Sequence, residues 1–266
     1  MCDPFSRRIN YLRISVTDRC NLRCVYCMPE EGVTLKRHEE ILSLEEIEAF
    51  TRVAVSMGIN KVRITGGEPL VRKGITTLVS RLSLINGITD LTMTTNGILL
   101  AQYAHELKAA GLHRINVSLD SVDPERFREI TRIGDISLVL AGIDAAQEAG
   151  LLPIKLNCVI TKSASEPHAV AVAEYARQRG FEIRYIRQMD LCSGSFWVVQ
   201  GGEGGNCSRC NKLRLTSTGG LRPCLFSDVE YDIRALGYEE AIKVSVECKP
   251  ERGTISKSGS FNGIGG

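Results

Sequence analysis

Six short apolar runs, each followed by an amphipathic segment, recur along residues 12–186 of the chain. Short apolar runs that alternate with segments of helical periodicity are typical of repeated βα units around a parallel sheet. Because parallel strands need crossover helices on their faces, the pattern leaves a doubly wound sheet or a full or partial barrel. The predicted strands are residues 12–16, 61–65, 91–95, 114–119, 153–160 and 182–186.

The ends of the predicted elements indicate where a site would form. Ser43 is placed to cap the first helix, Glu46 completes a capping box three residues later, and Gly58 ends the helix. In both architectures, ligands bind at the carboxyl ends of parallel strands. We therefore expect one composite site from the polar segments that follow four of the strands, which are residues 17–27, 66–69, 95–97 and 120–121.

Composition narrows the class of protein. The 266 residues are 43% hydrophobic, which suffices for one substantial core. With 33 basic and 31 acidic residues the formal charge is +2, which argues against nucleic acid or a membrane as the main partner. The chain has neither a signal peptide nor an apolar stretch of the roughly 20 residues that span a bilayer, so we expect a cytoplasmic location. In that compartment, its ten cysteines are expected to serve metals or catalysis.

Three cysteines, Cys20, Cys24 and Cys27, fall within eight residues after the first predicted strand. A structural zinc site needs four protein ligands, whereas a four-iron cluster on three cysteines leaves one iron open to a further ligand. From the spacing alone, a structural metal site completed by a remote residue such as His38 stays open.

A second group, Cys207, Cys210 and Cys224, lies in a tail rich in glycine. The alternatives here are a second iron–sulfur cluster with an open iron and a zinc knuckle that uses Cys248. The pattern changes near Met189, which predicts a barrel domain over residues 1–189 and a C-terminal cluster domain over residues 190–266.

The spacing Cys-x3-Cys-x2-Cys, with Tyr26 before the last cysteine, resembles the signature of radical S-adenosylmethionine (SAM) enzymes, and residues 66–69 resemble their GGEP element. The resemblance implies an α/β fold, a partial (β/α)6 TIM-like barrel with a small cysteine-rich C-terminal extension. It also implies a 4Fe–4S cluster on the first three cysteines, whose open iron chelates the methionine part of SAM. The residues implied to hold SAM are Tyr26, Gly67, Glu68, Thr94, Asn96, Ser118 and Met189.

More closely, the chain resembles the GTP 3′,8-cyclase family of molybdenum cofactor biosynthesis, over segments 12–20, 63–72, 94–97, 115–121 and 214–228 and at the terminal Gly265-Gly266. The resemblance implies a lyase that converts GTP to 3′,8-cyclo-7,8-dihydro-GTP after a 5′-deoxyadenosyl radical removes the ribose 3′ hydrogen. A second 4Fe–4S cluster on Cys207, Cys210 and Cys224 would grip the purine, and the diglycine tail would reach into the active site.

The same resemblance implies further roles and partners. A flavodoxin or ferredoxin would donate the electron, and a homodimer is left open. The implied catalytic residues are Arg13, Arg63 and Arg214, and the implied substrate contacts are these three with Lys61, Lys155, Arg184 and Lys212.

Two features depart from the cyclase pattern. The segment between Met189 and Cys207 is shorter than its counterpart, and Lys212 stands where the family carries an arginine. Lysine keeps a charge but loses the planar fork that contacts phosphate through two bonds. Two alternatives therefore stay open: a paralogue that acts on another nucleotide or a peptide, and a non-catalytic, metal-stabilised binding module.

Overall fold

The computed structural model describes residues 1–257, 261, 263 and 264 of the chain. The predicted role of Gly265-Gly266 in the active site therefore lies outside the described residues.

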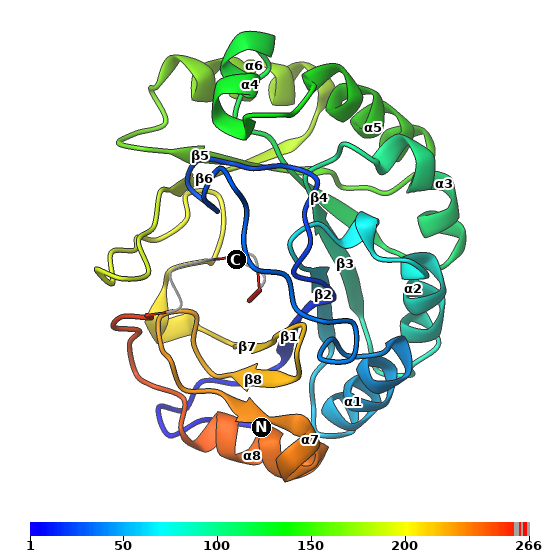
Figure 1. Cartoon of the computed structure of the whole chain (residues 1–266), viewed down its shortest axis with the longest axis vertical. Coiled ribbons are helices and arrows are strands. Elements are labelled where there is room, and N and C mark those ends of the chain that lie inside the picture. The colour runs from blue at the N-terminus through cyan, green and yellow to red at the C-terminus, as the bar shows by residue number, and fades with distance from the viewer. Residues whose placement is uncertain (258–260, 262, 265–266) are drawn as a thin grey trace.

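Within the described residues, nine strands form one curved sheet in the order β6-β5-β4-β3-β2-β1-β7-β8-β9 (Figure 1). Neighbouring strands are parallel from β6 to β7, and β8 and β9 are antiparallel. The predicted partial barrel is thereby confirmed, with the tail strands extending it beyond β1. The strands are β1 (Tyr11–Ser15), β2 (Lys61–Thr65), β3 (Asp90–Thr95), β4 (Arg114–Ser118), β5 (Lys155–Ile160), β6 (Glu182–Arg187), β7 (Lys212–Leu215), β8 (Gly220–Arg222) and β9 (Tyr231–Asp232).

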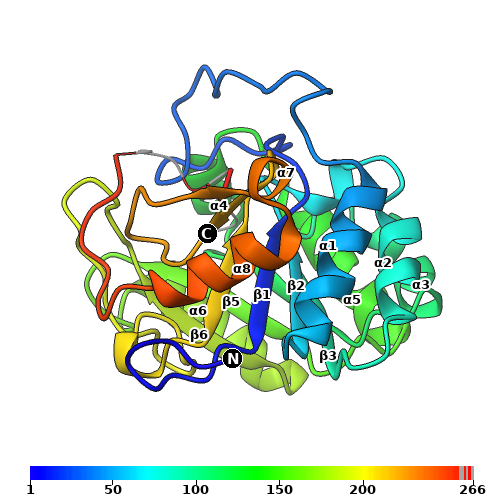
Figure 2. The same ribbon diagram turned by 90° about the horizontal axis from the view of Figure 1, so that it is seen from below.

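Helices cover the outer face of the sheet (Figure 1). The described helices are α1 (Leu44–Ser56), α2 (Ile75–Ser83), α3 (Leu100–Ala109), α4 (Pro124–Thr131), α5 (Ile136–Glu148), α6 (Pro167–Arg179), α7 (Ile233–Leu236) and α8 (Tyr238–Glu247), with short 3₁₀ helices η1 (Pro69–Val71) and η2 (Cys207–Arg209). Figure 2 shows the long connection between β1 and α1 rising above the carboxyl end of β1. None of the helices in the described part of the chain has both the length and the apolar character needed to cross a bilayer.

The alternating direction of successive side chains along the strands separates the hydrophobic core from the candidate site. In β1 and β2, Leu12 and Val62 are fully buried and belong to the main hydrophobic core with Phe50 of α1. The residues that follow them, Arg13 and Arg63, line a cavity inside the barrel. Because successive side chains of a strand point to opposite faces, the same strands build the apolar core and present polar groups to the cavity.

The first helix begins as predicted. The Ser43 hydroxyl accepts a hydrogen bond from the Glu46 N–H at 3.1 Å, and Glu46 Oε2 accepts one from the Ser43 N–H at 2.8 Å. Glu46 Oε1 also accepts a hydrogen bond from Arg234 Nε of α7 at 2.7 Å. One carboxylate therefore caps a barrel helix and ties it to the C-terminal tail.

Two connections differ from the predicted βα repeat. The prediction that a helix follows every strand is wrong for β6, because the described residues 188–206 contain no helix; the glycine-rich run 201–205 breaks the helical pattern there. Between β4 and β5 lie two helices, α4 and α5. The sheet continues through both predicted domains, because β7 pairs with β1, and the division at residue 189 stays a prediction.

Candidate functional site

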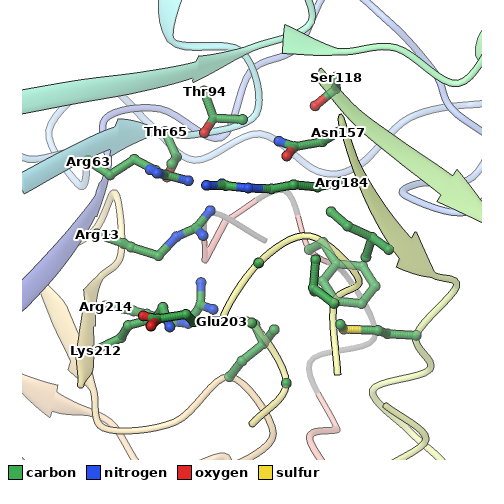
Figure 3. A pocket seen from close by; sticks show the side chains of 18 of the residues that line it. Arg13, Arg63, Thr65, Thr94, Ser118, Asn157, Arg184, Glu203, Lys212 and Arg214 are labelled. Atoms are coloured by element: carbon green, nitrogen blue, oxygen red, sulfur yellow. The ribbon is translucent and has the colours of Figure 1, made fainter. Parts of the chain in front are cut away.

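A cavity of about 640 Å³ opens inside the barrel, a volume that suits a small-molecule ligand. Its lining comes from the strands β1 to β7 and from the loops at their ends. Every residue that the sequence analysis assigned to a cluster, to SAM or to the substrate lines this cavity. Figure 3 shows polar and basic side chains directed into it from neighbouring strands.

The first three cysteines lie on the loop that follows β1. The backbone N–H groups of Cys27 and Met28 both donate to the Cys24 carbonyl, at 2.9 and 3.2 Å, which closes a turn. Burial raises the pKa of the Cys24 thiol, with Asp120 and the other two thiols adding to the effect, and burial raises the pKa of Cys27 to about 11. Clustered thiols with raised pKa are a donor set that a bound metal cluster would stabilise as thiolates.

Tyr26 of this loop is held by a carboxylate at the end of another strand. Its hydroxyl donates to Asp120 Oδ2 at 2.6 Å, and Asp120 Oδ1 accepts a hydrogen bond from the Val159 N–H of β5 at 2.7 Å. Burial raises the pKa of both Tyr26 and Asp120. The bridge therefore fixes the cysteine loop relative to the ends of β4 and β5.

The glycine-rich turn after β2 lies directly against the first cysteine loop. The Gly67 N–H donates to the Thr17 carbonyl at 2.8 Å, and the Glu68 N–H donates to the Arg19 carbonyl at 2.8 Å. A Cβ on Gly67 would lie 2.3 Å from that Arg19 oxygen, so the close approach requires glycine.

The Glu68 side chain organises the neighbouring strand end. Its carboxylate accepts hydrogen bonds from the Leu70 N–H at 3.0 Å and from the Thr95 hydroxyl and the Asn96 N–H, both at 2.7 Å. Burial raises the pKa of Glu68 to about 7, although these bonds act against the shift. Two carboxylate oxygens offer about four acceptor sites, so capacity remains for the amino group of a ligand.

Thr94, Asn96, Ser118 and Met189 complete the predicted SAM contacts along the cavity. The Thr94 hydroxyl is buried and has no hydrogen-bond partner among the described residues. Buried polar groups are nearly always satisfied, so this hydroxyl suits a polar ligand. Asn96 Nδ2 donates to Asn21 Oδ1 at 2.7 Å, which links the third loop to the cysteine loop.

Seven basic side chains around the cavity, which we call the basic belt, come from the strands β1, β2, β5, β6 and β7: Arg13, Lys61, Arg63, Lys155, Arg184, Lys212 and Arg214. The sheet register places Arg13 beside Arg63 on β2 and beside Arg214 on β7. Burial lowers the pKa of Arg13, and the Arg214 guanidinium lowers it further. Arg184 Nε is buried with no partner in the described part of the chain. Positive charges gathered in a cavity favour an anionic ligand.

The second cysteine group lines the same cavity beside Lys212. Cys207 is the first residue of η2 and Cys210 caps its C-terminal end. Lys249 Nζ donates to the Lys212 carbonyl at 2.8 Å and to the carbonyl of Pro223, the residue before Cys224. Burial acts to raise the pKa of Cys210, but Lys249 and other cations lower it overall. Nearby cations favour the thiolate, which is the form that binds a metal.

Sequence reasoning missed the anchor of this second group. Arg7 forms a buried ion pair with Asp3 at 2.6 Å and donates to the Cys207 carbonyl at 2.7 Å. It also donates to the carbonyls of Pro250 and Glu251, at 2.7 and 2.9 Å. Contacts from a side chain to distant carbonyls leave no pattern in the sequence, so no signal could have found this residue.

The candidate fourth zinc ligands lie elsewhere. His38 and Cys248 are exposed, and neither lines the cavity. In the described chain, no three or more His, Cys, Asp or Glu side chains are arranged to hold a single metal ion. The donor sets at the cavity consist of cysteines alone, which fits the ligand chemistry of iron–sulfur clusters.

Comparison with known proteins agrees with this chemistry. The family model of the radical SAM superfamily matches residues 14–183, most of the barrel, and defines the class of protein. The GTP 3′,8-cyclase of Pelotomaculum thermopropionicum is 43% identical, over 95% of this chain and 94% of that protein. The GTP 3′,8-cyclase of Moorella thermoacetica is 45% identical, over 88% of this chain and 86% of that protein. The chain belongs to the GTP 3′,8-cyclase family within the radical SAM superfamily, and as a member it uses SAM and an iron–sulfur cluster.

Solved structures share the fold. SuiB from Streptococcus suis, bound to SAM, has a TM-score of 0.64 and 18% identity over 91% of this chain and 64% of SuiB. Methylornithine synthase has a TM-score of 0.56 and 14% identity over 69% of this chain and 54% of that chain. At these identities the likeness concerns the fold.

The relatives also bear on the length of the chain. The alignment with the Pelotomaculum protein extends over 307 positions, although this chain has 266 residues. The alignment therefore contains segments of the relative that this chain lacks, while the predicted shortening between Met189 and Cys207 stays a prediction.

Proposed function

We propose that the chain converts GTP to 3′,8-cyclo-7,8-dihydro-GTP, a step of molybdenum cofactor biosynthesis, with SAM as the source of the radical. The observation that carries the proposal is that both cysteine groups and the basic belt line one cavity of about 640 Å³. A nucleotide held there would meet the SAM site and the second cysteine group at once.

The residues near the first cysteine loop would hold the radical source. Cys20, Cys24 and Cys27 would bind a 4Fe–4S cluster, which when bound supplies the electron that splits SAM into methionine and a 5′-deoxyadenosyl radical. Glu68 would accept a hydrogen bond from the amino group of SAM. The other proposed SAM contacts are Tyr26, Gly67, Thr94, Asn96, Ser118 and Met189.

The basic belt would bind and orient the triphosphate, because guanidinium groups pair with phosphate oxygens through two bonds. Arg13, Arg63 and Arg214, adjacent in the sheet register, are the proposed catalytic residues. They would hold the ribose so that the 5′-deoxyadenosyl radical takes the C3′ hydrogen, which gives 5′-deoxyadenosine, and C3′ then bonds to C8 of the guanine. Lys61, Lys155, Arg184 and Lys212 would contribute further contacts to the substrate.

We further infer a second 4Fe–4S cluster on Cys207, Cys210 and Cys224, which would hold the purine edge. A small redox protein such as flavodoxin or ferredoxin would supply two electrons per turnover, one to cleave SAM and one that, with a proton, reduces the cyclised nucleotide radical to the 7,8-dihydro product. A reducing, cytoplasmic setting is part of the proposal, because reductants there keep cysteines available as metal ligands. A homodimer stays an open expectation.

Anaerobic turnover tests the proposal. Protein reconstituted with iron and sulfide should, with SAM, GTP and a reductant, release the cyclic nucleotide together with 5′-deoxyadenosine. Cleavage of SAM that leaves GTP intact would contradict GTP as the substrate.

A paralogous reaction on another nucleotide or on a peptide is the second candidate. Lys212 favours it, because a lysine at this position of the cavity lacks the planar fork of an arginine. The predicted shortening between Met189 and Cys207 would change the same side of the cavity. Stoichiometric zinc with little iron would instead favour the non-catalytic binding module.

A further inference from the structure

The amino ends of the strands form a polar layer of the cavity. The first residue of each strand from β1 to β7 lines the cavity, and we call these residues the floor ring: Tyr11, Lys61, Asp90, Arg114, Lys155, Glu182 and Lys212. The proposed SAM contacts lie at the other ends of the strands, since Glu68 follows β2 and Ser118 is the last residue of β4. The floor ring and the proposed SAM site are therefore at opposite ends of the barrel.

The charge of the floor ring is uneven. Its two carboxylates, Asp90 and Glu182, each form an ion pair with a cation of the ring. Tyr11 lies instead between two lysines in the sheet register, Lys61 on β2 and Lys212 on β7. Around Tyr11, the ring therefore carries positive charge that its own carboxylates do not neutralise.

The Tyr11 side chain is held among cations on the inner face of β1. Side chains two positions apart share a face of a strand, so Tyr11 points to the same side as Arg13, while Leu12 between them is fully buried in the core. The Arg63 guanidinium lies 5.5 Å from the centroid of the Tyr11 ring, and Lys212 Nζ lies 5.7 Å from it. Both distances are within the range of cation–π attraction, so the ring keeps two positive charges beside it.

The Tyr11 hydroxyl is buried and has no hydrogen-bond partner among the described residues. A buried tyrosine hydroxyl usually donates to an acceptor. The side chains of Lys61, Arg63 and Lys212 are donors only and offer no acceptor to it. An anionic oxygen in the cavity would accept a hydrogen bond from Tyr11 and neutralise the cations around it.

We propose that Tyr11 is a further substrate-binding residue, whose hydroxyl donates a hydrogen bond to a phosphate oxygen of the ligand. This inference rests on the proposed nucleotide substrate and deepens it, because it directs the polyphosphate towards the floor ring. The nucleoside then extends from there towards the SAM site.

Anion binding to the reconstituted holoenzyme, measured by calorimetry at fixed ionic strength, tests the inference with inorganic tripolyphosphate as the probe. Tyr11→Phe removes the hydroxyl and keeps the ring over which Arg63 and Lys212 lie. The variant should bind tripolyphosphate roughly tenfold more weakly, as expected for the loss of a hydrogen bond to a charged group. Its affinity for SAM should stay unchanged, because Tyr11 lies at the other end of the barrel. The matched control is Tyr103→Phe, on α3 and outside the cavity, which should bind both ligands as the wild type does.

Each outcome decides the question. Unchanged tripolyphosphate affinity in Tyr11→Phe overturns the inference. An equal loss of affinity for SAM, or a fall in iron content or melting temperature, also overturns it, because Tyr11 would then have a structural role. Failure of the wild type to bind tripolyphosphate would mean that the floor ring is not an anion site.

A parallel titration with GTP isolates the proposed function. If Tyr11→Phe weakens tripolyphosphate binding while neither protein binds GTP, the role of Tyr11 as an anion contact stands and GTP fails as the substrate.

Discussion

The contact between Tyr26 and Asp120 couples the first cysteine loop to the strand ends beside it. A hydrogen bond to a charged group contributes about 1.5–3 kcal/mol. Asp120→Asn keeps the shape of the side chain but turns an amide N–H group towards one of two donors, the Tyr26 hydroxyl or the Val159 N–H. We expect the affinity of the reconstituted protein for SAM to fall roughly tenfold, measured by equilibrium binding.

Tyr26→Phe removes the same hydrogen bond and provides the matched control. It should weaken SAM binding by a similar factor, and combining it with Asp120→Asn should add little, because both changes break one contact. An unchanged SAM affinity in both single variants would show that the contact does not position Tyr26 for SAM.

Cysteine replacement separates the proposed roles of the two groups. Cys24→Ala should abolish SAM cleavage, because the first cluster loses a ligand. Cys210→Ala should still cleave SAM without making the cyclic nucleotide, since the second group would bind the substrate. Liquid chromatography of 5′-deoxyadenosine and the nucleotide product measures both. Equal behaviour of the two variants would contradict this division of labour.

Short-range spacing explains what the sequence could predict about single residues. The two cysteine groups and residues 66–69 stood out because their members are close in the chain. Asp120 was expected at the site as part of residues 120–121, but its hydrogen bond with Tyr26 was not predicted, since the two residues are 94 positions apart in the sequence.

Among the elements, helix α1 depends on Glu46 for both its cap and its link to Arg234. The hydrogen bond from Arg234, aided by the Ser43 cap, lowers the pKa of Glu46 from 4.5 to about 2. A carboxyl group whose pKa is lower in the folded state stabilises the protein at pH values above its pKa in the unfolded state. This stabilisation is lost as the pH falls from about 4.5 towards 2. Glu46→Gln should reduce the free energy of unfolding by about 0.5–1 kcal/mol near neutral pH.

The pH dependence sharpens that prediction. The difference in the free energy of unfolding between wild type and Glu46→Gln, measured with urea, should stay constant between about pH 6 and 8. The Glu46 carboxylate titrates well below that range. Glu45→Gln, on the same helix turn but bound to Arg81 at the surface, should have a smaller effect. A difference that changes across this pH range would assign the stabilisation to another group.

Periodicity predicted the strands and most helices, because alternation and capping are local properties. It failed after β6, where residues 188–206 form a loop of the described chain instead of a helix. The β7 strand was also missed: residues 212–215 are short and gain their partner only when the tail returns to β1. Pairing between segments about two hundred residues apart is a tertiary property that local pattern does not encode.

Over the whole molecule, both ends of the chain build the cavity together. The pairing of β7 with β1 sets Arg214 beside Arg13, and α8 packs near α1 on the outside. The N-terminal segment then closes the arrangement through Arg7, which joins Asp3, Cys207 and the backbone after α8. The second cysteine group therefore depends on a residue near the N-terminus.

Replacing Arg7 tests this dependence. The side chains of Arg7 and Asp3 are 6% and 0% exposed, so Arg7→Gln leaves a buried carboxylate without its partner, at a cost of about 3–5 kcal/mol. We expect a lower melting temperature. As the Cys207 loop loosens, the iron content should fall from about eight towards about four atoms per chain, because each 4Fe–4S cluster holds four.

Arg8→Gln, at an exposed neighbouring position, should retain the wild-type melting temperature and iron content. Iron analysis and calorimetry decide the matter: a fully loaded Arg7→Gln protein with an unchanged melting temperature would mean that the N-terminal segment does not support the second cysteine group.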